Sequence, residues 1–470
     1  MRVVSDRPDV PLLEPSWRVH LVGVGGAGMS ALALILLERG HQVSGSDLRG
    51  GRTCAALSAM GATIHVGHAG HHVEGADLVA TSAAIPVGNP ELLRAAELGI
   101  PIVRRAELLA ALIGQRRAIL VSGTHGKTTT TSMTTVCLQA AGADPSFAIG
   151  GTLHDSGTSA HHGLGDVFVA EADESDRSFL VHAPHCAVVT NVEFDHHDHY
   201  ADMQEVREAF EAFLARRVPG GLAVVCRDDP GAASLLERAD PPVLTYGTHQ
   251  EADLRIVEVA LRRDGAEFRL ERRGEDLGPF RLRLAGAHNV RNASAAAAAA
   301  LWAGVPVEAA REGLSGFSGV ARRFQRVGAA AGITVVDDYG HHPTELTSTL
   351  AAARQTQPDG RVVAVFQPHR FSRTAALGSE LGAALAGADV VVVTDVYAAG
   401  EAPVPGVTGA VVAEAARVRG AETYFVPSTG DVPEVVARLA APGDLVLTLG
   451  AGDITEVGAV LLRRLEDRRE

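Results

Sequence analysis

The sequence contains almost no lysine. It has 42 Lys and Arg residues together, and only Lys127, in the stretch "VSGTHGKTT", is a lysine. An ammonium is a compact point charge on a thin stem, whereas a guanidinium is a larger planar fork. Because arginine serves as the cation everywhere else, the retained lysine marks a position where a small cation is needed.

Other absences exclude whole classes of protein. The net charge of -14 argues against non-specific binding of nucleic acid or of an anionic membrane surface. The first residues, "MRVVSDRPDVPLLEPSW", lack the apolar segment of a signal peptide, and no apolar run is long enough to cross a membrane. The four cysteines are widely separated and form no C-x-x-C pair, so we expect reduced, structural thiols in a cytoplasmic protein. They are Cys54, Cys137, Cys186 and Cys226.

What remains is an ordinary globular composition arranged as three α/β units in series. Residues 18–46 have the pattern of a strand, a glycine turn, a helix and a second strand, and a similar unit opens at "RRAILVSGTHGK". Residues 254–284 alternate apolar and polar side chains around glycines, which predicts antiparallel hairpins. An alanine-rich helix follows, and a third α/β unit begins near "GITVVDDYG". The pattern predicts parallel sheets with crossover helices.

The loop that contains Lys127 has the features of a phosphate cradle. It lies between an apolar strand, 118–121, and a helical segment, so backbone N–H groups and a helix N-terminus can converge on an anion. Gly123 and Gly126 let the backbone approach closely, and the Thr128 hydroxyl can reach a magnesium ion. The strict pattern has glycine where this chain has Val121. We predict ATP binding here; GTP is disfavoured because its N-K-x-D motif requires a second lysine.

A second glycine loop follows the first strand of the chain. "GVGGAGMS" places Gly23, Gly25 and Gly28 in the G-x-G-x-x-G register, and Asp47 ends the next strand. This pattern fits an NAD-dependent dehydrogenase. It fits equally a site for the diphosphate and ribose of a nucleotide-linked substrate, which the ATP loop favours.

Polar residues follow two further buried strands. Glu171 comes after the strand 167–170, where a magnesium ligand is expected. "TNVEFDHHDHY" admits three interpretations: a zinc site, one histidine that assists a magnesium site, and structural or solvated side chains. The zinc interpretation is disfavoured because the histidines lack the usual paired spacing. The candidates in this string are Asp195, His196, His197, Asp198 and His199.

Two arginines follow a strand near the C-terminus. "FQPHRFSRT" contains Arg370 and Arg373, which could bind a carboxylate through paired hydrogen bonds or could form surface ion pairs.

Taken in order, the motifs resemble those of the Mur ligases over roughly residues 18–455. The motifs are "GVGGAGMSALA", "SGTHGKTTTT", "EADESD", "TNVEFDHHDHY", "GAHNVRNASAA", "RRFQ", "DDYGHHPTE" and "QPHRFSRT". The resemblance implies an α/β protein of three domains: an N-terminal Rossmann-like domain for a UDP-linked substrate (1–114), a central P-loop ATPase-type domain with an added β-hairpin segment (115–319), and a C-terminal Rossmann-like domain for an amino acid (320–470).

The resemblance also implies an activity. It is closest to the branch that uses ATP to join L-alanine to the lactyl carboxylate of UDP-N-acetylmuramate through an acyl phosphate, in peptidoglycan precursor synthesis. The implied cofactors are ATP and Mg²⁺, with Mn²⁺ possible, and the expected state is a monomer or weak homodimer without nucleic-acid or membrane partners. Other Mur ligases carry a carbamylated lysine near the metals. This chain has no second lysine for that role, consistent with the alanine-adding branch.

Site residues are carried over from the resemblance by motif. Lys127, Glu171 and His196 are implied as catalytic, and Thr128, Glu171 and His196 as metal ligands. The implied ATP-binding residues are Gly123, Thr124, His125, Gly126, Lys127, Thr128, Thr129, His288, Asn289, Asn292, Arg323 and Asp338. Those for the UDP-linked substrate are Gly25, Gly26, Gly28, Asp47, Ser82 and Arg105. Those for the amino acid are Tyr339, His341, His369, Arg370 and Arg373.

Three alternatives stay open on the sequence. A recycling ligase of the same family, which adds a preformed tripeptide, would share both nucleotide sites. An NAD-dependent dehydrogenase follows from the first glycine loop alone. A non-enzymatic nucleotide-binding module would leave Glu171, His196 and the arginine pair without a role.

Overall fold

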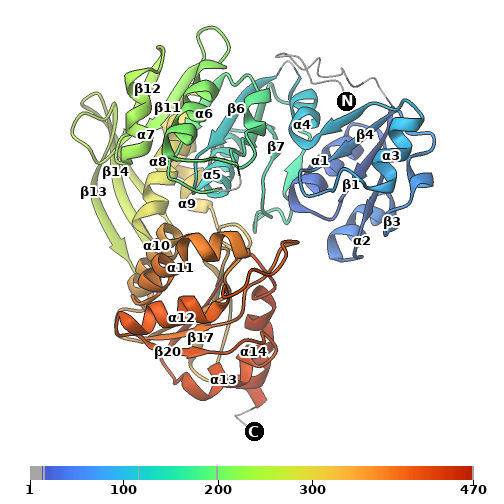
Figure 1. The fold of residues 1–470 in the computed structure, drawn as a ribbon. Coiled ribbons are helices and arrows are strands. Elements are labelled where there is room, and N and C mark those ends of the chain that lie inside the picture. Colours follow the sequence, from blue (N-terminus) through green and yellow to red (C-terminus); the bar gives the residue numbers. More distant parts are fainter. Residues whose placement is uncertain (1–12, 14–15, 115, 197–198, 468–470) are drawn as a thin grey trace. The chain divides into compact units, whose positions relative to one another are not determined.

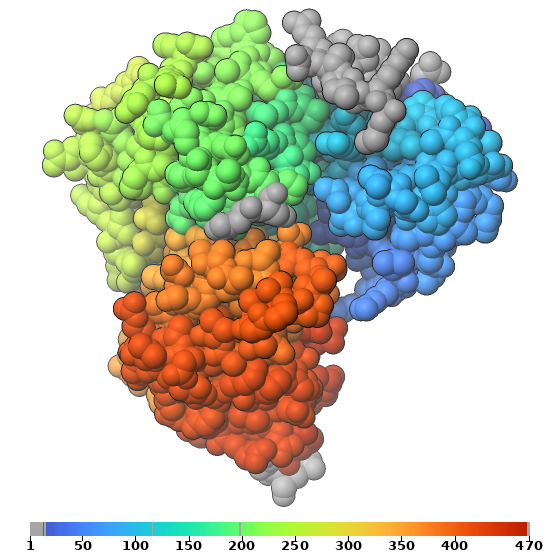
Figure 2. Space-filling model, in the orientation of Figure 1, coloured from blue at the N-terminus to red at the C-terminus, as the bar shows by residue number. Residues whose placement is uncertain are grey.

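The computed structural model describes residues 13, 16–114, 116–196 and 199–467; the other residues are grey in Figures 1 and 2. The described residues fall into two compact units that alternate along the chain. The first unit takes them from Met1–Asp195, Asp202–Arg255 and Ala293–Gly313, and the second from His196–Ala201, Ile256–Asn292 and Leu314–Glu470. Within these residues, the helices are all too short or too polar to span a bilayer.

The first sheet is parallel and has five strands in the order β3-β2-β1-β4-β5. Consecutive strands run outward from β1 in both directions, so the order reverses beside β1, where open α/β sheets bind ligands. The first glycine loop lies at this point, between β1 and α1 (Figure 1). The strands are β1 (Arg18–Val22), β2 (Gln42–Asp47), β3 (Thr63–Val66), β4 (Leu78–Thr81) and β5 (Ile102–Arg104). The helices are α1 (Ala27–Glu38), α2 (Arg52–Ala59), η1 (Gly70–Val73), α3 (Pro90–Glu97) and α4 (Arg105–Ile113).

The second sheet has ten strands in the order β15-β14-β13-β12-β11-β10-β6-β9-β7-β8. Its middle strands β10, β6 and β9 are parallel and almost wholly buried, so they are apolar on both faces. The strands are β6 (Arg117–Ser122), β7 (Ser146–Ala148), β8 (Ala160–His161), β9 (Val167–Glu171), β10 (Cys186–Val189), β11 (Leu222–Cys226), β12 (Val243–Gly247), β13 (Leu254–Arg262), β14 (Gly265–Arg272) and β15 (Glu275–Leu282). The helices are α5 (Lys127–Ala140), η2 (Ser178–Val181), α6 (Met203–Ala215), α7 (Pro230–Ser234), η3 (Leu235–Glu237), α8 (Ala287–Ala303) and α9 (Val307–Gly316).

Two sequence predictions for this region are confirmed. The alternating segment 254–284 forms β13, β14 and β15, and β14 and β15 pair antiparallel. The alanine-rich stretch is helix α8, where most of the alanines are fully buried because small side chains allow close packing.

The third sheet has six strands in the order β16-β17-β21-β18-β19-β20, parallel except for the antiparallel edge strand β16. Apolar clusters cover both of its faces. The strands are β16 (Gln325–Ala330), β17 (Ile333–Asp338), β18 (Val362–Phe366), β19 (Val390–Val393), β20 (Glu422–Phe425) and β21 (Leu445–Leu449). The helices are α10 (Pro343–Thr356), α11 (Phe371–Leu385), α12 (Gly409–Val418), α13 (Val432–Leu439) and α14 (Thr455–Asp467). The predicted fold class, an α/β protein with three units in series and an added β-hairpin segment in the central one, is confirmed.

Candidate active site

The loop around Lys127 connects the buried strand β6 to the helix α5. Gly126 has a left-handed backbone, φ 82°, and no side chain caps α5, so the first-turn N–H groups face the loop. Gly123 has φ 137°, and a Cβ at this position would lie 2.0 Å from the Thr190 hydroxyl oxygen. Only glycine fits at 123, because of the Thr190 side chain; the close approach of the backbone to an anion there stays a prediction.

The loop is held in shape by the residues that follow β10. Thr190 Oγ1 donates to the His125 carbonyl at 2.6 Å, and Asn191 Nδ2 donates to the same carbonyl at 2.9 Å. Asn191 Oδ1 accepts from the His125 N–H at 2.7 Å. Thr124 Oγ1 accepts from the Glu193 N–H at 2.8 Å. These bonds fix the backbone of the loop from the neighbouring strand.

The ammonium of Lys127 lies within the loop. Its Nζ donates to the carbonyls of Gly123 (2.6 Å) and Thr124 (3.2 Å) and to Glu174 Oε1 (2.8 Å). The Glu174 side chain is buried, at 2% exposure. Burial alone would lower the pKa of Lys127, but Glu174 and Asp173 outweigh it and raise the pKa above its ordinary value. Lys127 is therefore a fixed positive charge at neutral pH.

A second cation approaches the same acidic segment. Arg105, the first residue of α4, donates through Nη2 to Asp173 Oδ2 at 3.0 Å. Burial would raise the pKa of Asp173, but Lys127 and Arg105 lower it to about 2. Asp173 is thus ionised. It lies between Lys127 of the loop and Arg105 of helix α4 and interacts with both charges.

Two side chains that carry oxygen atoms, Thr128 and Glu171, meet at the end of β9. Thr128 Oγ1 donates to Glu171 Oε2 at 3.1 Å, and the other carboxylate oxygen accepts from the Gly150 N–H. A hydroxyl and a carboxylate at this separation beside a phosphate loop suit Mg²⁺, which prefers oxygen ligands and retains several waters. These residues fit a magnesium ion. The third predicted ligand, His196, belongs to the second unit and has φ 57°, so its role stays a prediction. His197 and Asp198 lie outside the described residues.

The first glycine loop carries its own carboxylate. Gly25 N–H donates to Asp47 Oδ2 at 3.0 Å, and a Cβ at Gly25 would lie 2.8 Å from that oxygen. A Cβ at Gly28 would lie 3.0 Å from Arg105 Cδ. The loop positions Gly25 and Gly28 and the predicted residues Asp47 and Arg105 thus lie together. Ser82 lies beside the loop too: its Oγ is 3.9 Å from the position of a Cβ on Gly23, and Gly26 donates to the Gly23 carbonyl.

The second unit contains the residues predicted for adenine and ribose. Asn289 and Asn292, at the start of α8, are buried and bonded to each other at 3.3 Å, and burial lowers the pKa of the neighbouring His288 to about 4. Asp338, at the end of β17, accepts from the N–H groups of Phe324 (2.7 Å) and Gly340 (2.8 Å). Burial raises its pKa to about 6.

The residues predicted for the amino acid also gather in the second unit. The ring centroids of Tyr339 and His341 are 5.3 Å apart, and those of His341 and His369 are 5.9 Å apart. Burial, together with His341, Arg373 and Arg370, lowers the pKa of His369 to about 3, so this imidazole is neutral. Arg373 is buried, and Arg370 has φ 69° and approaches Glu401 at 4.0 Å. Arg323 lies over the Tyr339 ring at 5.0 Å.

Family models match nearly the whole described chain in three consecutive parts. Residues 18–117 match the Mur ligase family catalytic domain, 121–300 the Mur ligase middle domain, and 322–452 the Mur ligase glutamate ligase domain. The chain belongs to the Mur ligase family.

Individual Mur ligases are similar over their full length. The UDP-N-acetylmuramate–L-alanine ligase of Streptomyces griseus is 50% identical over 457 residues, covering 96% of this chain and 98% of that protein. The corresponding ligase of Mycobacterium marinum is 48% identical, covering 96% of each chain. The crystal structure of the UDP-N-acetylmuramate–alanine ligase of Thermotoga maritima superposes with a TM-score of 0.83 at 29% identity, covering 96% of this chain and 100% of that one. A murein peptide ligase from Psychrobacter arcticus gives 0.73 at 25% identity, covering 96% and 99%.

Sequence reasoning missed several residues of this Mur ligase site. Glu174 binds Lys127, and Thr190 and Asn191 hold the loop. In the second unit, the Tyr397 ring stacks on His369 at 5.7 Å between centroids. Thr190 and Asn191 could have been identified in the sequence because they are two polar residues directly after a buried strand, β10, which pairs with β6. Tyr397 follows its own strand without a distinctive motif.

Proposed function

We propose that this chain uses ATP to join the amine of L-alanine to the lactyl carboxylate of UDP-N-acetylmuramate, with ADP and phosphate as the other products. The observation that carries the proposal is the coordination of Lys127, the only ammonium side chain, by the carbonyls of its own glycine loop and by Glu174. Relatives that bear this activity in their names share about half of their residues with the chain from end to end, which supports the same assignment.

Phosphoryl transfer needs little covalent help from the protein, so positioning and charge dominate. The first-turn N–H groups of α5 and the Lys127 ammonium would hold the transferring phosphate. Thr128 and Glu171 would hold Mg²⁺, which when bound offsets negative charge on the phosphates. The lactyl carboxylate takes the γ-phosphoryl group to become an acyl phosphate. The alanine amine then displaces phosphate from the acyl carbon.

The remaining predicted residues divide by substrate. The site for the UDP-linked substrate would be formed by Gly25, Gly26, Gly28, Asp47, Ser82 and Arg105. His288, Asn289, Asn292, Arg323 and Asp338 would bind the nucleoside of ATP, and His196 would complete the metal site. Tyr339, His341, His369, Arg370 and Arg373 would bind L-alanine, with the arginines on its carboxylate. The boundaries 1–114, 115–319 and 320–470 remain our proposal for the domains, and a cytoplasmic monomer or weak homodimer stays a prediction.

Phosphate release measured with purified enzyme, ATP, Mg²⁺ and UDP-N-acetylmuramate tests the proposal. L-Alanine, glycine, L-serine and the tripeptide L-Ala-γ-D-Glu-meso-diaminopimelate are supplied one at a time. We expect release with L-alanine at a kcat/KM at least tenfold above the other three. Preferential use of the tripeptide would assign the recycling activity instead. Release with none of the four would contradict a ligase.

A further inference from the structure

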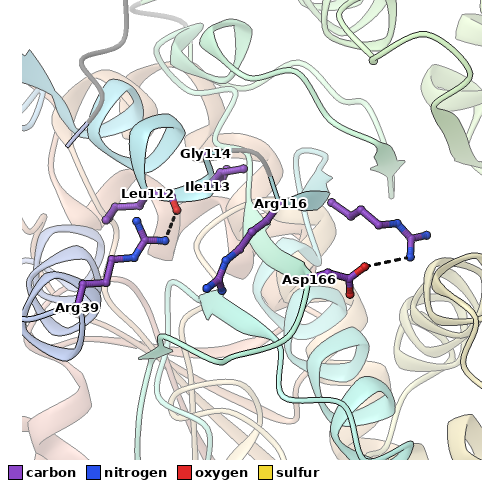
Figure 3. Close-up of a pocket in the computed structure, with 7 residues that line it drawn as sticks. Arg39, Leu112, Ile113, Gly114, Arg116 and Asp166 are labelled. Atoms are coloured by element: carbon purple, nitrogen blue, oxygen red, sulfur yellow. Dashed lines mark hydrogen bonds and ion pairs between the residues drawn. The ribbon is translucent and has the colours of Figure 1, made fainter. Parts of the chain in front are cut away.

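A cavity of the first unit lies at the edge of the second sheet opposite the nucleotide loop. It is open to solvent, has a volume of about 380 Å³, and is lined by residues from the ends of α1 and α4 and the starts of β6 and β9 (Figure 3). Parallel β6 begins at Arg117 at this edge and leads to the loop at Gly123 on the other side, roughly 20 Å away at about 3.3 Å per residue. The cavity is therefore separate from the site described above. Its lining residues are Arg39, Leu112, Ile113, Gly114, Arg116, Arg117 and Asp166.

Three of the seven lining residues are arginines, in a chain whose net charge is -14. The guanidinium groups of Arg39 and Arg116 come from opposite walls and converge on the same space (Figure 3). Arg117 stacks on the Trp302 ring at 4.7 Å, which orients its guanidinium. The positive charges are thus held in place.

Most N–H donors of the Arg39 and Arg116 guanidinium groups make no hydrogen bond within the described residues. Arg39 donates to the Leu112 carbonyl and to His162 Nδ1, and Arg116 donates to the Ser146 hydroxyl. A guanidinium has five N–H donors. Among the residues that the structure describes, no carboxylate comes within 4 Å of the guanidinium nitrogens of Arg39 or Arg116. A structural role is the alternative: Arg39 connects the end of α1 to the Leu112 carbonyl at the end of α4. This role would explain Arg39 but not Arg116.

The acids nearby are engaged elsewhere or only weakly. Asp166 lies 3.7 Å from Arg117, and its side chain is 73% exposed. Asp144, the acid that favours the charged form of Arg116, accepts from the Leu164 N–H at 2.7 Å and binds His161 at 3.0 Å. The carboxylate of Glu38 accepts from the His162 N–H and approaches His161 at 3.4 Å.

The positive charge of these arginines lowers the pKa of neighbouring cationic groups. Burial and the charge of Arg116 lower the pKa of Arg39 to about 10, and burial, Arg39 and Arg116 lower the pKa of His162. His162 is therefore neutral and accepts from Arg39. Such a concentration of guanidinium groups stabilises a multiply charged anion, since planar guanidinium donors match phosphate oxygens in pairs.

We propose that this cavity binds a phosphorylated small molecule, with its phosphate held by Arg39 and Arg116. The volume is within the range of small-molecule sites and exceeds what a lone phosphate ion fills. The ligand would connect the end of α1, which packs on the first sheet, to the starts of β6 and β9. Because the cavity and the nucleotide loop lie at opposite ends of β6, the ligand does not compete with ATP.

Titration calorimetry with pyrophosphate tests the proposal. The full-length chain is titrated in magnesium-free buffer at fixed ionic strength, and wild type is compared with Arg116→Gln. Arg438→Gln is the matched control, because it removes one positive charge from an exposed pair with Glu434 on α13. We expect the glycine loops to bind pyrophosphate too, so the quantity compared is the component of binding that depends on Arg116.

We expect wild type and Arg438→Gln to bind one more equivalent than Arg116→Gln, or the same equivalent at least tenfold more tightly, because a charge-assisted bond is lost. Identical isotherms for wild type and Arg116→Gln would overturn the proposal. Citrate is titrated in parallel, and equal or tighter Arg116-dependent binding of citrate would overturn the assignment to phosphorylated ligands.

A direct measurement covers the case in which Arg116→Gln alters folding. Crystals of the wild-type chain soaked in selenate should show an anomalous difference peak between Arg39 and Arg116. Selenate peaks confined to the two glycine loops would contradict the site.

Discussion

The two glycine loops of the first unit share a topology and differ in charge. Each follows a buried parallel strand, β1 or β6, and leads into a helix, α1 or α5. In the first loop the Gly25 N–H binds a carboxylate, Asp47. In the second, an ammonium binds the loop carbonyls, and the His125 N–H binds a neutral amide, Asn191. The shared strand–turn–helix unit therefore provides the same loop geometry in both places. A few side chains, which differ between the two loops, determine the charge next to each loop.

The supports behind the loops differ in the same way. The Ser46 carbonyl accepts from Gly23 and Val24 at the start of the first loop. The Ser46 hydroxyl donates to Glu91 Oε2 at 2.6 Å, and Glu91 also contacts His20, His68 and His72. The second loop is supported by the uncharged Thr190 and Asn191. Lowering the pH should therefore weaken the interactions that support the first loop, which include the carboxylate of Glu91, before it affects the uncharged residues that support the second loop.

The largest expected effect comes from Lys127→Arg. The space between the Gly123 carbonyl and Glu174 accommodates an ammonium, and a guanidinium must extend beyond it. We expect kcat to fall by roughly 10²–10³-fold, the usual loss when a transition-state charge contact is removed. The melting temperature should change by only a few degrees because the charge beside Glu174 is kept.

The reverse exchange is the control. Arg438→Lys, on the exposed pair with Glu434, should leave kcat unchanged. Near-normal turnover by Lys127→Arg would mean that the loop has no requirement for a small cation, and the account of the single lysine would be wrong.

Next in size is Gly123→Ala. Its Cβ would lie 2.0 Å from Thr190 Oγ1, so the loop and its support must separate. We expect a loss of unfolding free energy of about 2–4 kcal/mol and an ATP KM raised at least tenfold. Urea denaturation and initial rates measure the two effects.

Gly142→Ala separates strain from collision. Gly142 also has a positive φ, 76°, but nothing lies within 4 Å of a Cβ there. This variant should lose only about 1 kcal/mol and keep its ATP KM. Equal losses at both positions would show that backbone strain, rather than the contact with Thr190, sets the cost.

These residues show what the sequence could and could not predict. Gly123, Gly126 and Lys127 are neighbours in the chain, so their pattern is visible locally, as are the strands and helices around them. Glu174 and Asn191 reach the loop because β6 lies between β9 and β10 in the sheet. Strand order is set by tertiary packing, and within "EADESD" no local signal distinguishes Glu174, the partner of Lys127, from Glu171, the proposed metal ligand. The row formed by Tyr339, His341, His369 and Tyr397 depends on strand ends in the same way.

A smaller effect is expected from pH at the support of the first loop. Burial would raise the pKa of Glu91, but His20, Ser46 and His72 lower it to about 2, below the ordinary 4.5. The folded state therefore binds fewer protons at this group than the unfolded state. Its contribution is complete above pH 4.5 and is lost as the pH falls toward 2. The free energy of unfolding of the wild type should exceed that of Glu91→Gln by on the order of 2 kcal/mol at pH 7. This difference should become smaller below pH 4.5.

Urea denaturation of both proteins from pH 7 to pH 3 measures this gap. The difference between them isolates Glu91 from Asp338, whose raised pKa of about 6 acts in the opposite direction, adding stability as the pH falls through that value. A gap that stays constant with pH would contradict an ionised Glu91.

The smallest effect, from Asp47→Asn, decides what the first loop's carboxylate does. Its Oδ2 accepts from Gly25, and its Oδ1 accepts from the Arg49 N–H at 3.2 Å, so both oxygens bind the protein's own backbone. Asparagine keeps an oxygen acceptor but loses the charge, worth about 1 kcal/mol in such a bond. We expect the KM for UDP-N-acetylmuramate to rise about 5- to 10-fold. The kcat and the ATP KM should stay within about twofold, as both should for the exposed control Asp77→Asn.

A 2′-deoxyuridine form of the substrate separates the two possible roles of Asp47. If the carboxylate bound the ribose 2′-hydroxyl, as the sequence pattern predicts, Asp47→Asn would cost nothing further with the deoxy substrate. If it shapes the loop, as its bonds to Gly25 and Arg49 indicate, the same 5- to 10-fold rise should appear with both substrates, because two contacts that do not interact contribute additively. We expect the additive result: the carboxylate of the first loop then serves its own backbone alone, whereas the Lys127 ammonium, which also binds its own loop carbonyls, is proposed to hold a phosphate as well.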